Sequence, residues 1–328
     1  MFKIEEIKMR QTLRYALLVT LVAASTSHAQ TWPARPIRML VGFPPGGPTD
    51  VVGRLVAERL TDQLRQQAVI DNRPGAAGNI AAEIVAKANP DGYTLLFSSS
   101  AIALSPGMYT RLGYDPVKDL APITEIGSGQ LVLAVHPSLP VKSVREFIDY
   151  AKARPGQLNY GSSGAGTGTH FGPLLFSRQV GIETQHIPYK GTAPTLVDAI
   201  AGRVQFIMGT LNTALPHIRD NRLRALGVTG LKRSAVLPEA PTLDEAGVTG
   251  FLLTSWQALF APAATPPAVL DRLHAEVTRA VRSAELKPKL DQQDVEPTVP
   301  PRAEFAKSYR AELAKWTKLA KEVGLKAD

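Results

Sequence analysis

Cysteine is absent from the 328-residue sequence. Its absence excludes disulfide bonds, thiolate metal sites and thiol nucleophiles. The sequence also lacks histidines at the spacings typical of metal sites. Four histidines stand isolated, outside any H-x-x-x-H or H-E-x-x-H spacing: His136, His186, His217 and His274. We therefore predict no metal site.

An apolar run of about 20 residues, the length that spans a membrane, is also missing. The one candidate, YALLVTLVAA, has about half that length, follows basic residues and precedes Ser27 and Ala29 at the small-residue positions that a signal peptidase reads. We predict a signal peptide over residues 1–29, cleaved near Ala29, and export of the mature chain to the periplasm. The sequence leaves open whether translation starts at Met1 or Met9.

Clusters of basic and aromatic residues are absent too. Removal of residues 1–29 takes away four basic and two acidic residues, so the net charge falls from +8 to +6. The remaining basic residues are dispersed through helical stretches such as RLVAERLTDQLR, whereas a nucleic-acid surface gathers them on one face. We predict no nucleic-acid partner, and a mild positive field that favours small anions.

The full chain is long enough for two domains, because 328 residues exceed what one hydrophobic core usually organises. Strand-like and helix-like stretches alternate, which is typical of a parallel sheet covered by helices. We expect strands over 36–43, 68–74, 93–100, 130–136, 158–163, 184–189, 204–209 and 224–230. We expect helices over 50–64, 78–92, 143–156, 171–181, 195–203, 266–283 and 304–324, the last two packing on the first domain.

Three loops rich in small residues join predicted strands to predicted helices. We call them the first glycine loop (41–50, VGFPPGGPTD), the second glycine loop (161–170, GSSGAGTGTH) and the third glycine loop (189–194, YKGTAP). Open α/β sheets bind ligands at such junctions, where the helix offers free N–H groups and the positive end of its dipole. Gly46 and Gly47 let the backbone approach a ligand, so we predict an anion site.

Hydroxyl groups accompany these loops. The second glycine loop and the stretch FSSS at 97–100 carry hydroxyls that can donate hydrogen bonds to an oxyanion; those of the loop belong to Ser162, Ser163, Thr167 and Thr169. No loop fits a nucleotide motif, because no lysine completes a P-loop and Thr169 stands where G-x-G-x-x-G needs glycine. We predict one ligand held between two domains, and no cofactor.

A secreted serine hydrolase is the alternative from another class, with Ser162 or Ser163 as nucleophile and His170 as base. The G-x-S-x-G elbow is missing. His170 lies in the first turn of a predicted helix, a position more typical of packing or capping. We predict that the protein is not an enzyme and keep the hydrolase as its rival.

Five stretches of the chain resemble a known family: WPARPIRMLVGFPPGGPTDVVGR, NRPGAAGNIAAEIVAKANPDGYTLL, NYGSSGAGTGTHFGPLLF, IPYKGTAPTLVDAIAGRVQFIMG and PEAPTLDEAGVTGF. In this order, over residues 31–328, they resemble the periplasmic substrate-binding receptors of tripartite tricarboxylate transporters, the Bug family. The resemblance implies a type II periplasmic-binding-protein fold, in which two α/β domains joined by two crossover strands close on a ligand. The domains expected are 30–128, 129–252 and 253–328, the last returning to the first domain.

The resemblance also implies site residues, position by position. In the first glycine loop and the third strand they are Phe43, Gly46, Gly47, Ser98, Ser99 and Ser100. In the second and third glycine loops they are Gly164, Gly166, Thr167, His170, Tyr189, Gly191 and Ala193. Asp50 matches the family as well, but its position favours capping of the helix over contact with an anion.

The partners follow from the same resemblance. It implies a small organic carboxylate held by backbone amides, hydroxyls and water, integral membrane transporter subunits, and a monomer. A sensor protein that receives the ligand is the alternative partner. Many members have an acidic residue where this chain has Gly209, which makes amino acids less favoured as ligands.

Overall fold

The computed structural model describes residues 32–326, and the predicted signal peptide lies outside them. From Arg35 onward the chain forms one compact unit. It contains a mixed sheet in the order β2-β1-β3-β9-β4-β7-β5-β6, with β8 and β10 paired to β4. Within the described residues no helix has the length and apolarity to cross a membrane.

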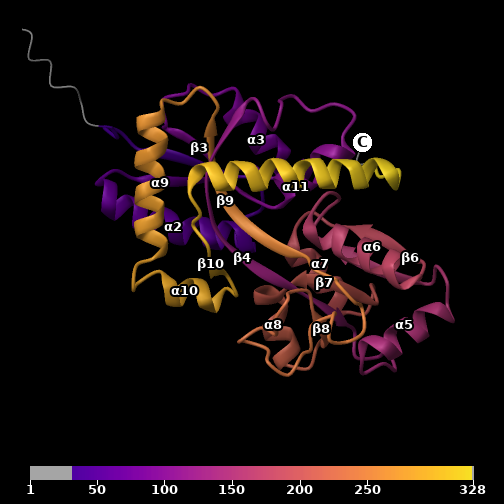
Figure 1. The fold of residues 1–328 in the computed structure, drawn as a ribbon. Helices are drawn as coiled ribbons and strands as arrows, with labels where there is room; N and C mark the ends of the chain where they lie inside the picture. The colour runs from indigo at the N-terminus through magenta and orange to yellow at the C-terminus, as the bar shows by residue number, and fades with distance from the viewer. Residues whose placement is uncertain (1–31, 327–328) are drawn as a thin grey trace, which may run out of the picture. The chain divides into compact units, whose positions relative to one another are not determined.

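The first domain is built on three parallel strands with helices between them (Figure 1). Its elements are β1 (Ile37–Val41), α2 (Pro48–Leu64), β2 (Ala68–Asn72), the 3₁₀ turn η1 (Ala76–Gly78), α3 (Asn79–Ala86), β3 (Thr94–Ser99), α4 (Ala101–Leu104) and η2 (Pro106–Met108). Four of the five β1 side chains are fully buried, as expected for a strand covered on both faces. Proline at the first position of α2 suits a helix start, because its missing N–H would have no partner there.

The second domain repeats the arrangement. Its elements are α5 (Val144–Lys152), β5 (Leu158–Ser162), α6 (Gly168–Val180), β6 (Thr184–Pro188), α7 (Thr192–Ile200), β7 (Phe206–Thr210), α8 (Leu211–Arg219) and β8 (Arg224–Val228). Strand β5 pairs in parallel with both β6 and β7. The sequence did not predict α8, whose helical pattern is interrupted by Pro216.

Two long strands cross between the domains: β4 (Leu120–Val135) and β9 (Thr254–Pro262). Residues Leu120–Gln130 of β4 pair antiparallel with β9, and the rest of β4 pairs with β7 and β8. The expectation of a parallel sheet is therefore wrong at the crossover, and β4 begins ten residues before the predicted strand 130–136. Its first part, LAPITEIGSGQ, mixes apolar and polar residues irregularly, and two register shifts interrupt it, so it lacks a clear alternating pattern.

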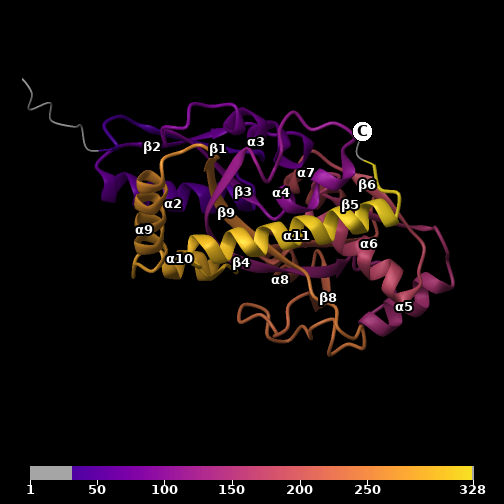
Figure 2. The ribbon, with the colours of Figure 1, turned by 45° about the horizontal axis from the view of Figure 1, so that its top comes forward.

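The C-terminal segment comprises α9 (Pro267–Val281), α10 (Lys287–Gln292), β10 (Glu296–Pro297) and α11 (Arg302–Glu322). Figures 1 and 2 show α11 running from the α10 side of the first domain to α6 of the second. Phe305 and Tyr309 pack on Phe260 of β9, whereas Trp316 lies 5.6 Å from Phe171 of α6. Helix α11 therefore contacts the cores of both domains, whereas the sequence predicted packing on the first domain alone.

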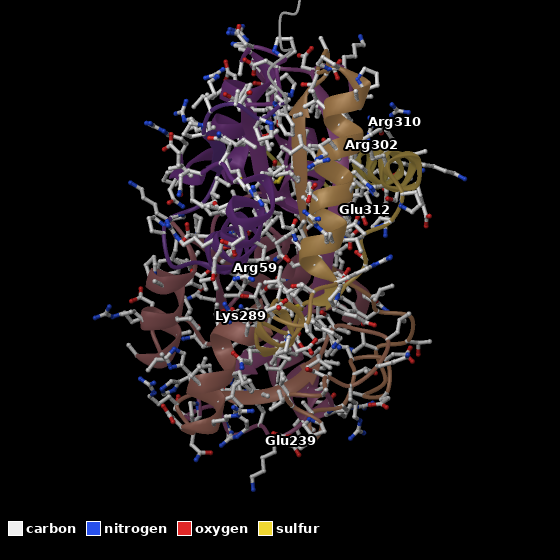
Figure 3. The ribbon with its side chains drawn as sticks, turned by 90° about the vertical axis from the view of Figure 1, so that its left-hand side faces the viewer. Arg59, Glu239, Lys289, Arg302, Arg310 and Glu312 are labelled. Atoms are coloured by element: carbon white, nitrogen blue, oxygen red, sulfur yellow. The ribbon has the colours of Figure 1, made fainter. Side chains whose placement is uncertain are left out.

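One face of the first domain, formed by α2, α9 and α10, is viewed in Figure 3, which labels Arg59, Lys289 and Glu312. Lys289 of α10 lies 3.5 Å from Glu58 of α2. Glu312 of α11 accepts a hydrogen bond from the indole N–H of Trp256. Polar contacts of charged residues thus link α10 to α2 and α11 to β9. The domain boundaries at 128/129 and 252/253 remain a prediction.

Replacing Phe305 by alanine tests the packing of α11. Phe305 is 1% exposed, so its loss leaves a cavity and should lower the free energy of unfolding by about 3–5 kcal/mol. Urea denaturation followed by circular dichroism measures the change. Leu231→Ala serves as a control, because Leu231 is 74% exposed and should change stability by less than about 0.5 kcal/mol. Equal effects of the two substitutions would contradict the assigned packing.

Candidate ligand-binding site

A cavity of about 290 Å³ lies where the three glycine loops meet β3, β4 and β9. The first domain lines it with Phe43 to Thr49, Ser99, Ser255 and Gln257. The second domain lines it with Ser163, Thr167 to Thr169, Lys190 to Pro194, Leu196, Thr210 and Thr213, and Leu131 of β4 completes it. The predicted convergence of loops from two domains on one cleft is therefore present.

Four helices begin at this cavity without a side-chain cap. Their N-cap residues all line it: Gly47 for α2, Thr167 for α6, Gly191 for α7 and Thr210 for α8. The first N–H groups of a helix lack partners inside the helix, and the dipole makes this end positive. Four such ends around one cavity favour a negatively charged guest.

Asp50 fixes the first glycine loop from behind. Its carboxylate accepts hydrogen bonds from the Gly46 N–H at 2.8 Å, from Arg54 at 2.9 Å and from Asn72 at 2.8 Å. Asn72 also donates to the carbonyl of Phe43. Burial alone would raise the pKa of Asp50, but these hydrogen bonds outweigh it and lower the pKa. Asp50 therefore shapes the loop, and the N–H of Gly46 is already engaged.

Hydroxyl groups link the second glycine loop internally. Thr169 Oγ1 accepts from the N–H of Ser163 and lies 2.9 Å from the hydroxyls of Ser163 and Thr167. Thr167 Oγ1 also lies 2.7 Å from the carbonyl of Gly164 and donates to it. Ser163, Thr167 and Thr169 face the cavity, so this network presents neutral hydroxyls to a ligand.

Two stacked histidines lie beneath the same loop, their ring centroids 4.0 Å apart. His170 Nδ1 accepts from the N–H of Gly166, and His186 Nε2 lies 2.6 Å from Ser162 Oγ. Burial lowers the pKa of His170 to about 4, and burial together with the neighbouring His170 lowers the pKa of His186 to about 3. Both imidazoles are therefore neutral near pH 7 and act as supports of the loop.

The serines of the hydrolase alternative have partners other than His170. Ser162 is fully buried and bonds His186 rather than His170. Ser163 faces the cavity, but its hydroxyl bonds Thr167 and Thr169. Neither serine is paired with His170 in the structure.

Among the described residues that line the cavity, Lys190 is the only charged one, and its side chain is exposed. Within the described residues no group of three or more histidine or acidic residues could hold a metal ion. A ligand in this cavity would therefore meet N–H groups, hydroxyls, one carboxamide and one ammonium group, with apolar contacts from prolines and leucines.

The structure divides the predicted site residues into two groups. Eight line the cavity: Phe43, Gly46, Gly47, Ser99, Thr167, Thr169, Gly191 and Ala193. Seven do not line it: Ser98, Ser100, Ser162, Gly164, Gly166, His170 and Tyr189. Contact of any of the fifteen with a ligand remains a prediction.

The second group has other partners or none. Tyr189 donates to Asp198, and the N–H of Gly164 donates to Ser162. The hydroxyl oxygens of Ser98 and Ser100 are buried and have no partner among the described residues. Ser99 lines the cavity, whereas its neighbour Ser98 in β3 points to the opposite face and Ser100 lies past the end of the strand, at the start of α4.

Several lining residues were missed by the sequence reading. They are Thr49, Lys190, Thr192, Thr210, Thr213, Ser255 and Gln257. Thr210 ends strand β7 and Thr213 lies in the first turn of α8, so the same strand-to-helix rule could have found them. Ser255 and Gln257 required β9 to be identified as a strand with one face toward the cavity.

Comparison with known proteins assigns the chain to a family. A family model described as "Tripartite tricarboxylate transporter family receptor" matches residues 52–325. The chain belongs to this family. The resemblance of the five sequence stretches to these receptors is confirmed.

Individual relatives agree with the assignment. Protein BugT of Bordetella pertussis is 36% identical over 307 residues, which cover 93% of this chain and 94% of that protein. The structure of R. palustris Rpa4515 with adipate has a TM-score of 0.85 and 38% identity, covering 90% of this chain and 99% of that one. MatC from Rhodopseudomonas palustris with bound malate has a TM-score of 0.80 and 30% identity, covering 88% and 99%.

These neighbours also confirm the two-domain α/β fold. The family is one of receptors that bind solutes.

The histidine pair predicts a loss of stability in mild acid. The unfolded protein binds protons on these histidines near pH 6.5, whereas the folded protein resists protonation until about pH 4 or below. Since the unfolded state then binds more protons, the free energy of unfolding should fall as the pH drops from about 6.5 to about 4. His186→Asn should flatten this dependence, as measured by urea denaturation across that range. An identical pH profile in the variant would show that His186 carries none of the effect.

Proposed function

We propose that this receptor binds a small organic carboxylate in the cavity between its domains, in the periplasm, and delivers it to membrane subunits of a tripartite transporter. The observation that carries the proposal is the convergence of four uncapped helix N-termini on a cavity with no acidic lining residue. Preformed donors around an anion need little reorganisation on binding.

Neutral donors are sufficient for this task. A hydrogen bond to a charged acceptor contributes about 1.5–3 kcal/mol, so a few of them offset the lost hydration of one carboxylate. Lys190 at the rim adds a positive charge that attracts anions from solution. A ligand ammonium group would find no carboxylate among the lining residues, which, with Gly209 in β7, disfavours amino acids.

Bound ligands of related proteins support the same chemistry. Rpa4515 was solved with adipate and MatC with malate, both dicarboxylates. Membership of the receptor family supports membrane transporter subunits as the partner. We keep the monomer as a proposal, and presentation of the ligand to a sensor protein is separated from transport by identifying the membrane protein that the loaded receptor captures.

Two glycines of the second domain, Gly166 and Gly191, lie close to residues of the first domain. A Cβ added to Gly166 would lie 2.8 Å from the Cβ of Ser105, and one added to Gly191 would lie 3.0 Å from Pro44 Cγ. Residues of the second domain thus approach the first closely enough to exclude a methyl group. This contact supports a cleft that closes over its ligand.

A thermal-shift screen of carboxylates tests the ligand class. At 100 times its dissociation constant a ligand should stabilise the native state by about 2.7 kcal/mol, which is seen as a rise in melting temperature. Mono-, di- and tricarboxylates form the test set, with amino acids, sugars and cations as controls. A response confined to the controls would refute the proposal.

Replacing Gly166 by alanine tests the closure. The added methyl group meets Ser105 and Ala77 of the first domain, so the cleft should not close and ligand affinity should fall at least tenfold. Isothermal titration calorimetry with the best carboxylate from the screen measures it.

Gly247→Ala is the matched control. Gly247 has a similar positive φ, +95° against +85° for Gly166, but open space around it. Both variants should therefore lose similar stability to backbone strain, and only Gly166→Ala should lose affinity. Equal affinities would mean that closure does not need this glycine.

A further inference from the structure

Gln257 carries a buried carboxamide at the cavity. The residue is 4% exposed, lies on β9 and lines the cavity, yet its Oε1 has no hydrogen-bond partner among the described residues. Its neighbour Trp256 points to the opposite face, where it packs on Phe305 and donates to Glu312. Strand alternation therefore fixes the Gln257 side chain toward the cavity.

The surroundings of this carboxamide are polar and uncharged on the cavity side. Gln257 pairs across the strands with Ser99 of β3, which also lines the cavity and whose Oγ accepts from the N–H of Ala101. Ser255, two residues earlier on the same strand, lies on the same cavity wall. A buried polar atom without a partner costs free energy, so its retention here indicates a partner that arrives with the ligand.

We infer that Gln257 is a specificity-determining residue, whose carboxamide hydrogen-bonds an oxygen atom of the ligand other than those of the carboxylate held at the helix N-termini. This inference rests on the proposed function. A carboxamide donates through its N–H₂ and accepts through its oxygen, so it suits a ligand hydroxyl, carbonyl or second carboxylate. The ligand class is an organic anion with a second oxygen-bearing group, rather than a plain alkanoate.

The selectivity has a physical reason. An alkanoate of the same length would leave the buried carboxamide unpaired, whereas its oxygenated counterpart satisfies it. The competing explanation is a water molecule bound to Gln257, since the side chamber beside it, lined also by Asn212, Gln293 and Asp294, measures about 10 Å³. With such a water in place, Gln257 would not distinguish the two ligands.

The experiment compares matched ligands by isothermal titration calorimetry. The pairs are butanoate with succinate, succinate with malate, and hexanoate with adipate. The native protein should bind the more oxygenated member of at least one pair at least tenfold more tightly. Gln257→Leu should bring the ratio for that pair to within about threefold of unity while the less oxygenated member still binds.

Gln257→Glu keeps the shape of the side chain and adds a negative charge. It should weaken a dicarboxylate more than the matched monocarboxylate, which a role in packing alone would not produce. Gln179→Leu removes an equivalent carboxamide that is exposed and bonded to the Thr249 carbonyl, far along α6, and should leave every ratio unchanged. Thermal unfolding verifies that each variant is folded, and Gln257→Asn replaces Gln257→Leu if the latter is not.

The outcomes separate the two claims. Failure of every carboxylate to bind the native protein would overturn the proposed function and this inference with it. Binding with no preference within any pair, or with a preference that Gln257→Leu leaves intact, would overturn the inference alone. A preference that collapses in Gln257→Leu and reverses toward the monocarboxylate in Gln257→Glu would support it.

Discussion

The antiparallel pairing of β4 with β9 is the constraint on which the rest of the structure depends. Residues Leu120–Gln130 of β4 run beside β9, and the remainder of β4 continues into the ladder with β7 and β8. The two domains therefore share hydrogen-bonded backbone at the floor of the cleft. Because β9 also pairs with β3, the side chains that face the cavity from this floor are held by the most extensively paired part of the sheet.

The cavity walls are built differently from its floor. They consist of loops from separate domains, each of which is held from behind by side chains that do not face the ligand. Asp50 accepts a hydrogen bond from the N–H of Gly46, and His170 accepts one from the N–H of Gly166. These two side chains accept hydrogen bonds from the loop backbone on the side away from the cavity and so hold the loops in place. The helix N-termini that face the cavity begin at Gly47, Thr167, Gly191 and Thr210.

Helix α11 adds a second link between the domains, away from the floor. Its first turns pack on aromatic residues of β9, and Trp316 packs on Phe171 in α6. Since α6 begins at the second glycine loop, the packing of Trp316 and the anion-facing end of that helix belong to one rigid element. Core packing and the position of the loop are therefore coupled.

The sequence by itself determined the alternating elements, the glycine loops and the family. Apolar periodicity located most helices and strands, and glycine between a strand and a helix located the loops, because both signals depend on neighbouring residues only. These rules together with the family resemblance named eight residues that line the cavity. The periodicity rules failed at the first part of β4, where apolar and polar residues mix irregularly and leave no clear alternating pattern.

Only the tertiary structure decided which side chains face the ligand. Ser98, Ser99 and Ser100 are three identical residues in a row, but Ser98 points to the other face of β3 and Ser100 lies at the start of α4, so only Ser99 lines the cavity. Gln257 became a site residue because β9 lies across β3 with Gln257 opposite Ser99, a pairing between residues 158 positions apart. Such contacts depend on chain crossing and register, and no local pattern encodes them.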